Sequence, residues 1–174
     1  MDKKFAKESY TEMNELVLPN DTNTFGNLMG GRLLYWMDIC AAMAAQKHSN
    51  SPVVTVSVDN VSFKRSIKIG EVVTIQAQVT RAFSTSMEVR MEIFAQNLPK
   101  GTRDKSNEAY YTFVAIDKEN VPTKVPMLMP ETDLEKELFE KASQRRELRL
   151  ILGGKLSAEH AISIQNLLKV AQKG

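Results

Sequence analysis

The chain has 174 residues, of which 43% are hydrophobic, enough for one domain with a buried core. Its 23 basic and 21 acidic residues leave a formal net charge of +2, which argues against a protein that coats nucleic acid or another polyanion. The single cysteine, Cys40, excludes an intrachain disulfide and favours a reducing compartment. The N-terminal residues lack the apolar stretch of a signal peptide, and no segment of about 20 apolar residues predicts a membrane span. We therefore expect a cytoplasmic protein.

The first predicted elements are a strand and a long helix. Polar and apolar residues alternate loosely from 9 to 18, before a turn cluster at 19–21, which is typical of a strand. Residues 32–47 are rich in leucine, methionine and alanine and contain no proline, which predicts a helix. The only charged residue from 33 to 45 is Asp38. Because a helix that is apolar all round must be covered on every side, we expect this one to lie in the core.

Four more strands are predicted after the helix. They are rich in β-branched and aromatic residues, alternate in polarity, and span 53–64, 71–83, 86–97 and 107–117. Short turns separate them, and short connections favour antiparallel neighbours. The element order predicts an α+β fold in which an antiparallel sheet wraps around or packs over the helix.

The composition changes after residue 125. Thr132 and Glu135 have capping-box spacing at the start of a strongly charged helix. After Gly153 and Gly154, a second amphipathic helix is predicted with Ser157 as its N-cap. Because about 45 residues make a poor independent core, we expect one domain over 1–125 and a helical extension over 126–174.

Two adjacent glycines, Gly30 and Gly31, precede the predicted helix. They match a phosphate-binding P-loop only partly, because Arg32 and Leu33 stand where that motif needs lysine and then serine or threonine. Glycines at a helix start still allow close backbone approach, and the free N–H groups there favour an anion or an oxyanion. The alternative is that both glycines only let the helix pack tightly against the sheet.

Asp38 is the strongest single signal, because an unpaired carboxylate in a dry core costs several kcal/mol. It is expected to be a general base or nucleophile in a cleft. An exposed seam on the helix or a structural hydrogen bond to a strand remain alternatives. His48 ends the helix, where the dipole favours a cation, and His160 lies in the extension, so neither suits catalysis. The sequence shows no metal-ligand spacing and no serine in a G-x-S-x-G setting.

Basic and hydroxyl side chains gather at two predicted turns, where they could hold phosphates. Ordinary solvated hairpin charges are an equally good explanation for any one of them. The candidates are Lys64, Arg65 and Lys68 at the first turn, and Arg81, Ser84, Thr85 and Ser86 at the second.

Three stretches together resemble the acyl-CoA thioesterases of the hotdog fold, in particular the cytosolic acyl-CoA hydrolase group. They are DTNTFGNLMGGRLLYWMD at 21–38, VVTVSVD at 53–59 and FKRSIKIGE at 63–71, within a similarity that covers about 9–117. The resemblance implies an antiparallel sheet wrapped around a long central helix. It also implies a homodimer as the functional unit, commonly assembled into a trimer of dimers. It places a catalytic asparagine at Asn27 and a catalytic aspartate at Asp38 of the partner subunit.

The resemblance and the residues then suggest one reaction, the hydrolysis of acyl-CoA to a free acid and CoA. Asp38 would act on water or attack directly, Asn27 would position water or substrate, and the N–H groups near Gly30 and Gly31 would stabilise the oxyanion. Neither a metal nor a cofactor beyond the CoA of the substrate is expected. One alternative is a hotdog protein that binds acyl-CoA as a regulatory ligand without turnover. A hotdog dehydratase is a weaker alternative, because that chemistry usually relies on an active-site histidine.

Overall fold

The computed structural model describes residues 2–59, 61–62 and 65–171. The chain divides into two compact units, Met1–Met129 and Pro130–Gly174. The predicted boundary, between 125 and 126, lies four residues earlier. The boundary differs because the short strand β7 (Met127–Met129) pairs in parallel with β1 (Lys3–Phe5) and therefore belongs to the first unit.

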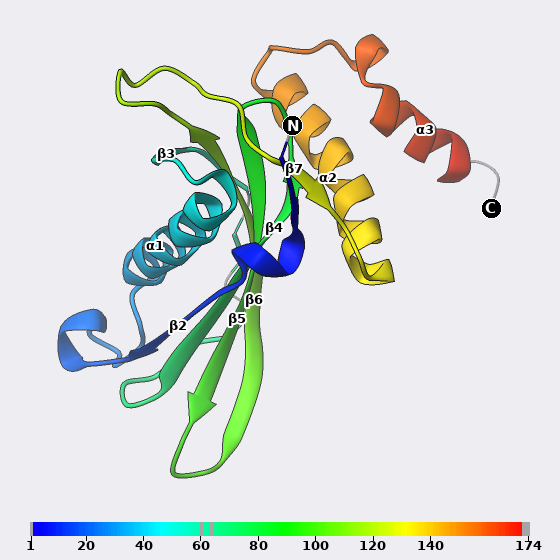
Figure 1. The fold of residues 1–174 in the computed structure, drawn as a ribbon. Helices are drawn as coiled ribbons and strands as arrows, with labels where there is room; N and C mark the ends of the chain where they lie inside the picture. Colours follow the sequence, from blue (N-terminus) through cyan, green and yellow to red (C-terminus); the bar gives the residue numbers. More distant parts are fainter. Residues whose placement is uncertain (1, 60, 63–64, 172–174) are drawn as a thin grey trace. The chain divides into compact units, whose positions relative to one another are not determined.

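Five antiparallel strands form the main sheet of the first unit, as predicted, in the spatial order β2, β4, β5, β6, β3 (Figure 1). Tight hairpins join β4 to β5 and β5 to β6, which explains why neighbours in sequence are neighbours in the sheet. The bounds of the strands are β2 (Thr11–Leu16), β3 (Val53–Val58), β4 (Val72–Ala82), β5 (Ser86–Asn97) and β6 (Thr102–Ala115).

Two strand boundaries differ from the prediction. β6 begins at Thr102 because its polar first residues continue the hairpin with β5, where Thr102 pairs with Asn97. β3 ends at Val58, and Asp59 adds one more backbone bond, from its N–H to the carbonyl of Tyr110 at 3.0 Å. Positions 60, 63 and 64 of the predicted strand lie outside the described residues.

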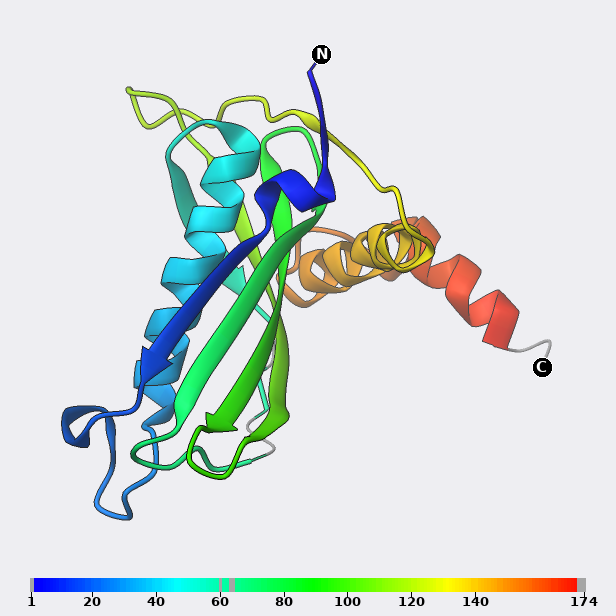
Figure 2. The same cartoon turned by 60° about the horizontal axis from the view of Figure 1, so that its bottom comes forward.

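Helix α1 (Gly30–Ser49) lies along one face of the sheet, and the strands curl around it (Figure 2). Alternate residues of the strands point at it; on β5, for example, Met87, Val89, Met91 and Ile93 are fully buried. Each such side chain contributes about 1.5–3 kcal/mol when buried. The predicted hotdog arrangement, a curled antiparallel sheet with a long helix, is confirmed.

Within one chain, the coverage of α1 is less complete than predicted. Trp36, Met37 and Cys40 are buried, but Tyr35 is 56% exposed and Met43 is 38% exposed. The expectation that the helix is covered on every side is therefore wrong for one chain. An apolar stripe along α1 stays open, and Asp38, which is half-buried, lies between Tyr35 and Met43 along the helix.

The C-terminal end of α1 is anchored by groups distant in sequence. Lys4 Nζ donates to the carbonyl of Lys47 at 2.6 Å, and the buried His48 donates from Nε2 to the carbonyl of Pro126 at 2.9 Å. Burial lowers the pKa of His48 and outweighs the Pro126 carbonyl, which raises it. The prediction that the helix dipole favours a charged His48 is therefore wrong. Removing the charged ring from water costs more free energy than its interaction with the helix dipole contributes.

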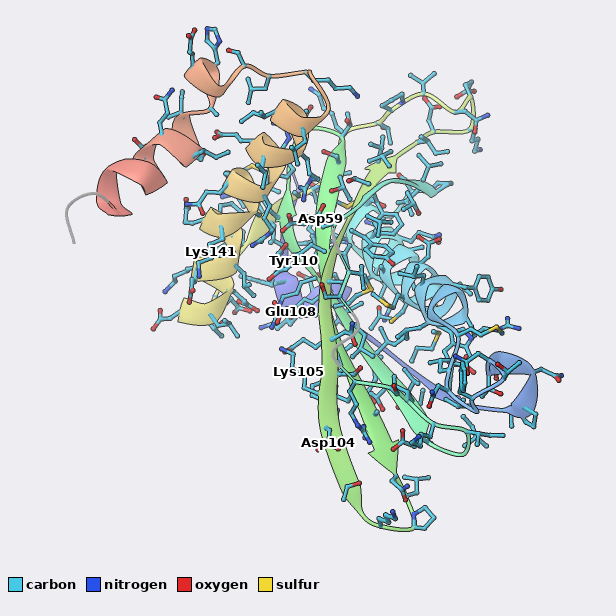
Figure 3. The ribbon with its side chains drawn as sticks, turned by 180° about the vertical axis from the view of Figure 1, so that it is seen from behind. Asp59, Asp104, Lys105, Glu108, Tyr110 and Lys141 are labelled. Carbon is cyan, nitrogen blue, oxygen red and sulfur yellow. The ribbon has the colours of Figure 1, made fainter. Side chains whose placement is uncertain are left out.

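Charged side chains form a network on the face of the sheet away from α1, where Lys105, Glu108 and Tyr110 follow one another along β6 (Figure 3). Glu108 accepts from Arg90 Nε at 3.0 Å, from Lys105 Nζ at 2.8 Å and from the Tyr110 hydroxyl at 2.7 Å. The hydrogen bond from Arg90 is the main reason why the pKa of Glu108 falls to about 2, although burial opposes it.

This network predicts acid sensitivity. Because an ordinary glutamate has a pKa near 4.5 and Glu108 has a folded pKa of about 2, its charge stabilises the fold above pH 4.5. That stabilisation is lost as the pH falls from 4.5 towards 2. Glu108→Gln should lower the free energy of unfolding at pH 7 by about 1 kcal/mol, a value discounted for the partial exposure of the group. In chemical unfolding at stepwise lower pH, the difference should vanish near pH 2. The exposed Glu140→Gln is the control, and a Glu108→Gln difference that stays constant with pH would contradict the prediction.

The second unit contains α2 (Asp133–Leu152) and α3 (Ile162–Ala171). The predicted capping box is confirmed, because Thr132 Oγ1 accepts from the Glu135 N–H at 3.1 Å while the Glu135 carboxylate accepts from the Thr132 N–H. The predicted start of the second helix is wrong: Ser157 precedes only a 3-10 turn, Ala158–His160.

The N-terminus of α3 is capped by tertiary contacts. Glu147 of α2 accepts from the N–H groups of Ser163 and Ile164 at 3.1 and 3.0 Å. A carboxylate from another helix therefore fills the role that the sequence assigned to Ser157.

Candidate functional site

The loop before α1 is held in one shape by Asn23. Its side-chain Oδ1 accepts the N–H groups of Phe25 at 3.0 Å and Asn27 at 3.2 Å, and its carbonyl accepts the N–H of Gly26 at 3.0 Å. Gly26 has a φ of +69°, a conformation that favours glycine. Oδ1 of Asn23 is thus occupied by the loop, whereas its Nδ2 group has no hydrogen-bond partner among the described residues.

A second segment fixes the position of this loop. The N–H of Leu28 donates to the carbonyl of Ile67 at 2.7 Å, and the N–H of Ile69 donates to that of Gly26 at 3.0 Å. Arg32 of α1 forms an ion pair with Asp21 at 2.9 Å on the other side. The loop is thus tied to both α1 and the turn before β4.

A pocket of about 210 Å³ lies where the loop meets residues 65–67. It brings together three predicted site residues, Asn27, Gly30 and Arg65. Ligand sites usually measure about 300–1,000 Å³, so this pocket fits one part of a substrate. Its lining consists of polar side chains from Asn23, Asn27, Arg65 and Ser66, apolar ones from Leu28, Leu33 and Ile67, and Gly30.

The two glycines stand at the first turn of α1, as predicted. The N-cap is Met29, which offers no side-chain cap, and among the described residues the N–H groups of Gly30 and Gly31 have no acceptor. A Cβ built on Gly31 would meet no atom within 4 Å. Packing inside this chain therefore does not require glycine at position 31, and the open space suits a group that approaches from outside.

Asp38 is half-buried and its Oδ1 accepts the hydroxyl of Thr55, on β3, at 2.8 Å. Asp38 therefore makes the hydrogen bond to a strand that was one of the alternatives. This bond uses Oδ1 and leaves Oδ2 available. Asp38 lies eight residues beyond Gly30, about 12 Å along the helix axis. Within one chain the carboxylate and the helix start are thus too far apart to act on the same carbonyl.

Of the two described basic residues of the first turn, Arg65 lines the pocket and Lys68 does not. Its Nη2 contacts the buried Glu71 at 2.8 Å, its Nη1 lies 3.6 Å from Asp104, and Nη1 is a buried atom without a hydrogen-bond partner. Lys68 Nζ makes a long contact of 3.5 Å to the Asn27 side chain. Lys64 lies outside the described residues.

The second predicted basic turn lies elsewhere. Arg81, Ser84, Thr85 and Ser86 are at the hairpin that ends β4, whereas Glu71 and Arg65 are at its start. A strand of 11 residues spans about 35 Å, so the two turns are at opposite ends of the sheet. Within one chain they do not form a single phosphate-binding patch.

Two side chains of this region were not predicted. Asn23 lines the pocket together with the predicted Asn27, and an asparagine three residues before a glycine is a recognisable turn signal. Thr55 lies in a strand of valines, and its polarity was the only available clue. Its contact with Asp38 depends on the packing of β3 against α1.

The sequence matches the Thioesterase superfamily over residues 25–102. It is also 35% identical over 146 residues to the uncharacterized acyl-CoA thioester hydrolase YkhA of Bacillus subtilis, a match that covers 84% of this chain and 85% of that protein. The chain belongs to the acyl-CoA thioesterases of this superfamily. The predicted family is confirmed.

Solved structures agree with this family assignment. A hexameric acyl-CoA thioesterase in its apo form has a TM-score of 0.85 and 39% identity to this chain, over 88% of this chain and 98% of that one. The acyl-CoA hydrolase of Staphylococcus aureus, solved with butyryl-CoA, CoA and CoA disulfide, has a TM-score of 0.80 and 36% identity over 97% and 99% of the two chains. Variants of that hydrolase with an aspartate, a threonine or an asparagine replaced by alanine have also been solved.

The chain spans 25–28% of the length of the mouse and rat acetyl-coenzyme A thioesterases and the mouse acyl-coenzyme A thioesterase 11, which it matches at 36–39% identity. Among the residues that the structure describes, no helix is long and apolar enough to cross a membrane.

Proposed function

We propose that the thioesterase hydrolyses acyl-CoA to a free carboxylic acid and CoA, with Asp38 as the base. The observation that carries this proposal is the Asp38 carboxylate, held by Thr55 at 2.8 Å on the uncovered stripe of α1, in a chain of this family. A carboxylate that is oriented by one hydrogen bond and open on its other oxygen can take a proton from water. Asp38 is the only acidic residue of α1.

The asparagine of the site is better assigned to Asn23 than to Asn27. In the S. aureus hydrolase, the substituted asparagine lies 15 residues before the substituted aspartate, and the substituted threonine lies 17 residues after it. Asn23 and Thr55 have the same separations from Asp38 in this chain, whereas Asn27 is 11 residues away. The free Nδ2 of Asn23 is also a suitable donor to a carbonyl oxygen. In this proposal Asn27 lines the pocket without a direct role.

The reaction then follows from the groups present. Water attacks the thioester carbonyl carbon while Asp38 takes one of its protons. The carbonyl oxygen becomes an oxyanion, which accepts hydrogen bonds from Asn23 Nδ2 and from the N–H groups of Gly30 and Gly31. When the carbon–sulfur bond breaks, the CoA thiolate recovers the proton from Asp38 and the acid is released. No metal or cofactor besides the substrate's CoA is part of this proposal.

A homodimer is needed to bring these groups together, because Asp38 is about 12 Å from the helix start in its own chain. The exposed apolar surface supports a second copy as the partner. β3 is an edge strand of the sheet, and its valines Val54, Val56 and Val58 are 42%, 54% and 50% exposed. The other edge strand, β2, carries Glu12 and Glu15, and charges of this kind protect an edge. Pairing of β3 with its copy would extend the sheet and cover the stripe on α1.

Higher assembly and location are part of the same proposal. The hexameric relative supports a trimer of dimers. In such an assembly the hairpin with Arg81, Ser84, Thr85 and Ser86 could meet CoA phosphates bound near Arg65 of another subunit. Rodent relatives named cytosolic acyl coenzyme A thioester hydrolases, 33% identical over 139 residues, support a cytoplasmic location.

An assay of thiol release tests both the reaction and the choice of asparagine. The thioesterase should liberate CoA from acyl-CoA, detected with a thiol reagent, over a series of short to long acyl chains. Asn23→Ala should lower kcat by about 100-fold or more, the usual cost of losing one oxyanion donor. Asn27→Ala is the matched control, with an expected change below about threefold, because the side chain it removes lines the pocket without donating to the oxyanion. A larger loss in Asn27→Ala than in Asn23→Ala would reverse the assignment, and acyl-CoA binding without CoA release would exclude hydrolysis.

A further inference from the structure

Tyr111 is a buried residue that the proposed reaction has not yet used. It lies on β6 with 1% of its surface exposed, on the face of the sheet that packs against α1. No described residue forms a hydrogen bond with its hydroxyl. The hydroxyl oxygen is not among the fully buried polar atoms that lack a partner, so it stays open to a group that the single chain does not supply.

The strand register places Tyr111 near the residue that holds Asp38. Thr55 of β3, which donates to Asp38, pairs directly with Phe113 of β6. Tyr111 is two residues from Phe113 on β6 and therefore points to the same face, next to the Thr55–Phe113 pair; a bulge between Thr55 and Ser57 makes Val58 its direct partner on β3. Thr55, which holds Asp38, and Tyr111 thus lie on neighbouring strands, on the face of the sheet that packs against α1.

The protonation state of Tyr111 suits a hydrogen-bond donor. Burial and, after it, the nearby charge of Asp38 raise the pKa of Tyr111 to about 12. The hydroxyl therefore keeps its proton throughout the pH range in which an enzyme of this kind works. The same effect shows that the Asp38 carboxylate is close enough for its charge to act on Tyr111.

We propose that the Tyr111 hydroxyl and Asp38 together hold the attacking water. The water donates one hydrogen to Asp38 and accepts the Tyr111 O–H on one lone pair, which leaves its second lone pair for the thioester carbonyl. Asp38 takes the proton as the oxygen–carbon bond forms, and Tyr111 keeps its own proton, so it acts as a positioning residue. This inference rests on the proposed hydrolysis with Asp38 as the base.

Tyr111→Phe tests the inference because it removes one oxygen atom and breaks no hydrogen bond between described residues. We expect kcat to fall about tenfold, the effect of one lost hydrogen bond in the transition state, with KM within about twofold of wild type. The melting temperature should stay the same or rise. Tyr110→Phe is the matched control on the opposite face of the same strand. It loses the bond to Glu108 at 2.7 Å, so its melting temperature should fall slightly while kcat stays unchanged.

A second measurement separates water positioning from a general structural effect. Hydroxylamine added to the assay competes with water for the acyl group and forms a hydroxamate, from which the hydroxamate that forms in the absence of enzyme is subtracted. If Tyr111 positions water, Tyr111→Phe should raise the ratio of hydroxamate to free acid by about fivefold or more. The substitution slows attack by water, which needs the Tyr111 hydrogen bond, more than attack by hydroxylamine. An unchanged kcat, or an unchanged product ratio, in Tyr111→Phe would overturn the inference. If Asp38→Asn hydrolyses acyl-CoA at the wild-type rate, the proposed function on which this inference rests would be overturned instead.

Discussion

Asp38→Asn is expected to lower kcat for acyl-CoA by about 100- to 10,000-fold, the range that a positioned general base contributes. The substitution preserves shape, and an amide oxygen can still accept the Thr55 hydroxyl that lies 2.8 Å from Asp38 Oδ1. The melting temperature should therefore change little, so that lost activity reports chemistry and not unfolding. Steady-state kinetics and thermal unfolding of the same preparations check both expectations. A variant that keeps wild-type kcat would remove Asp38 from the mechanism.

Dimers that combine two inactive variants test whether Asp38 acts together with Asn23 of a partner subunit. In the proposed dimer, an Asp38→Asn chain paired with an Asn23→Ala chain forms one site with both residues intact. When the two proteins are unfolded together and refolded in equal amounts, half of the dimers should be mixed. Activity should recover to about one quarter of the wild-type value, because each mixed dimer has one working site of two. Mixed dimers that form but stay inactive would show that the two residues act within one chain.

Val56→Lys is expected to dissociate the proposed dimer and abolish its activity at the same time. Val56 is 54% exposed on the edge strand β3, where a lysine would place an unpaired charge in the proposed interface. Burying such a charge costs several kcal/mol, and a two-fold interface contains it twice. A loss of about 4 kcal/mol weakens the dissociation constant by about 1,000-fold. Light scattering after gel filtration, with the thiol-release assay on each fraction, measures both effects.

Val121→Lys provides the matched control for the β3 variant. Val121 is 53% exposed, nearly the same as Val56, but follows the end of β6 in the 116–122 turn, which is closed by the Ile116–Pro122 bridge. It should leave both mass and activity unchanged. If Val56→Lys yields a monomer with full activity, the active site lies within one chain and the shared-site proposal fails.

Local signals were sufficient for much of the fold. Alternation and short turns predicted β4 and β5 to within a residue or two, because hairpin pairing is set by neighbours in the chain. The Thr132 capping box predicted the start of α2 for the same reason. Predictions failed where distant groups compete. Glu147 replaces Ser157 at the start of α3, and burial lowers the pKa of His48 although the helix end alone would favour its charged form.

The candidate site divides in a similar way. Asp38, Gly30 and Gly31 stood out in the sequence because a lone acid and paired glycines are unusual in an apolar helix. Which asparagine accompanies them depends on the hydrogen bonds of the 23–27 turn and on residue separations in a relative, neither of which the local pattern encodes. The basic turns illustrate the limit most clearly, since charge alone does not reveal that β4 separates Arg65 from Arg81.

The sequence by itself determined an antiparallel sheet that packs with a helix carrying one carboxylate, because period, turn residues and capping act over a few neighbouring positions; the curl of the sheet is what the family resemblance implies. Only the tertiary structure decided the surroundings of that carboxylate: the Thr55 hydroxyl that orients it, the Tyr111 ring beside it and the uncovered stripe of α1 around it. These contacts join residues 17 and 73 positions apart from Asp38. Chain folding brings them together because burial of the apolar faces of α1 and the sheet sets which polar groups meet at their edge.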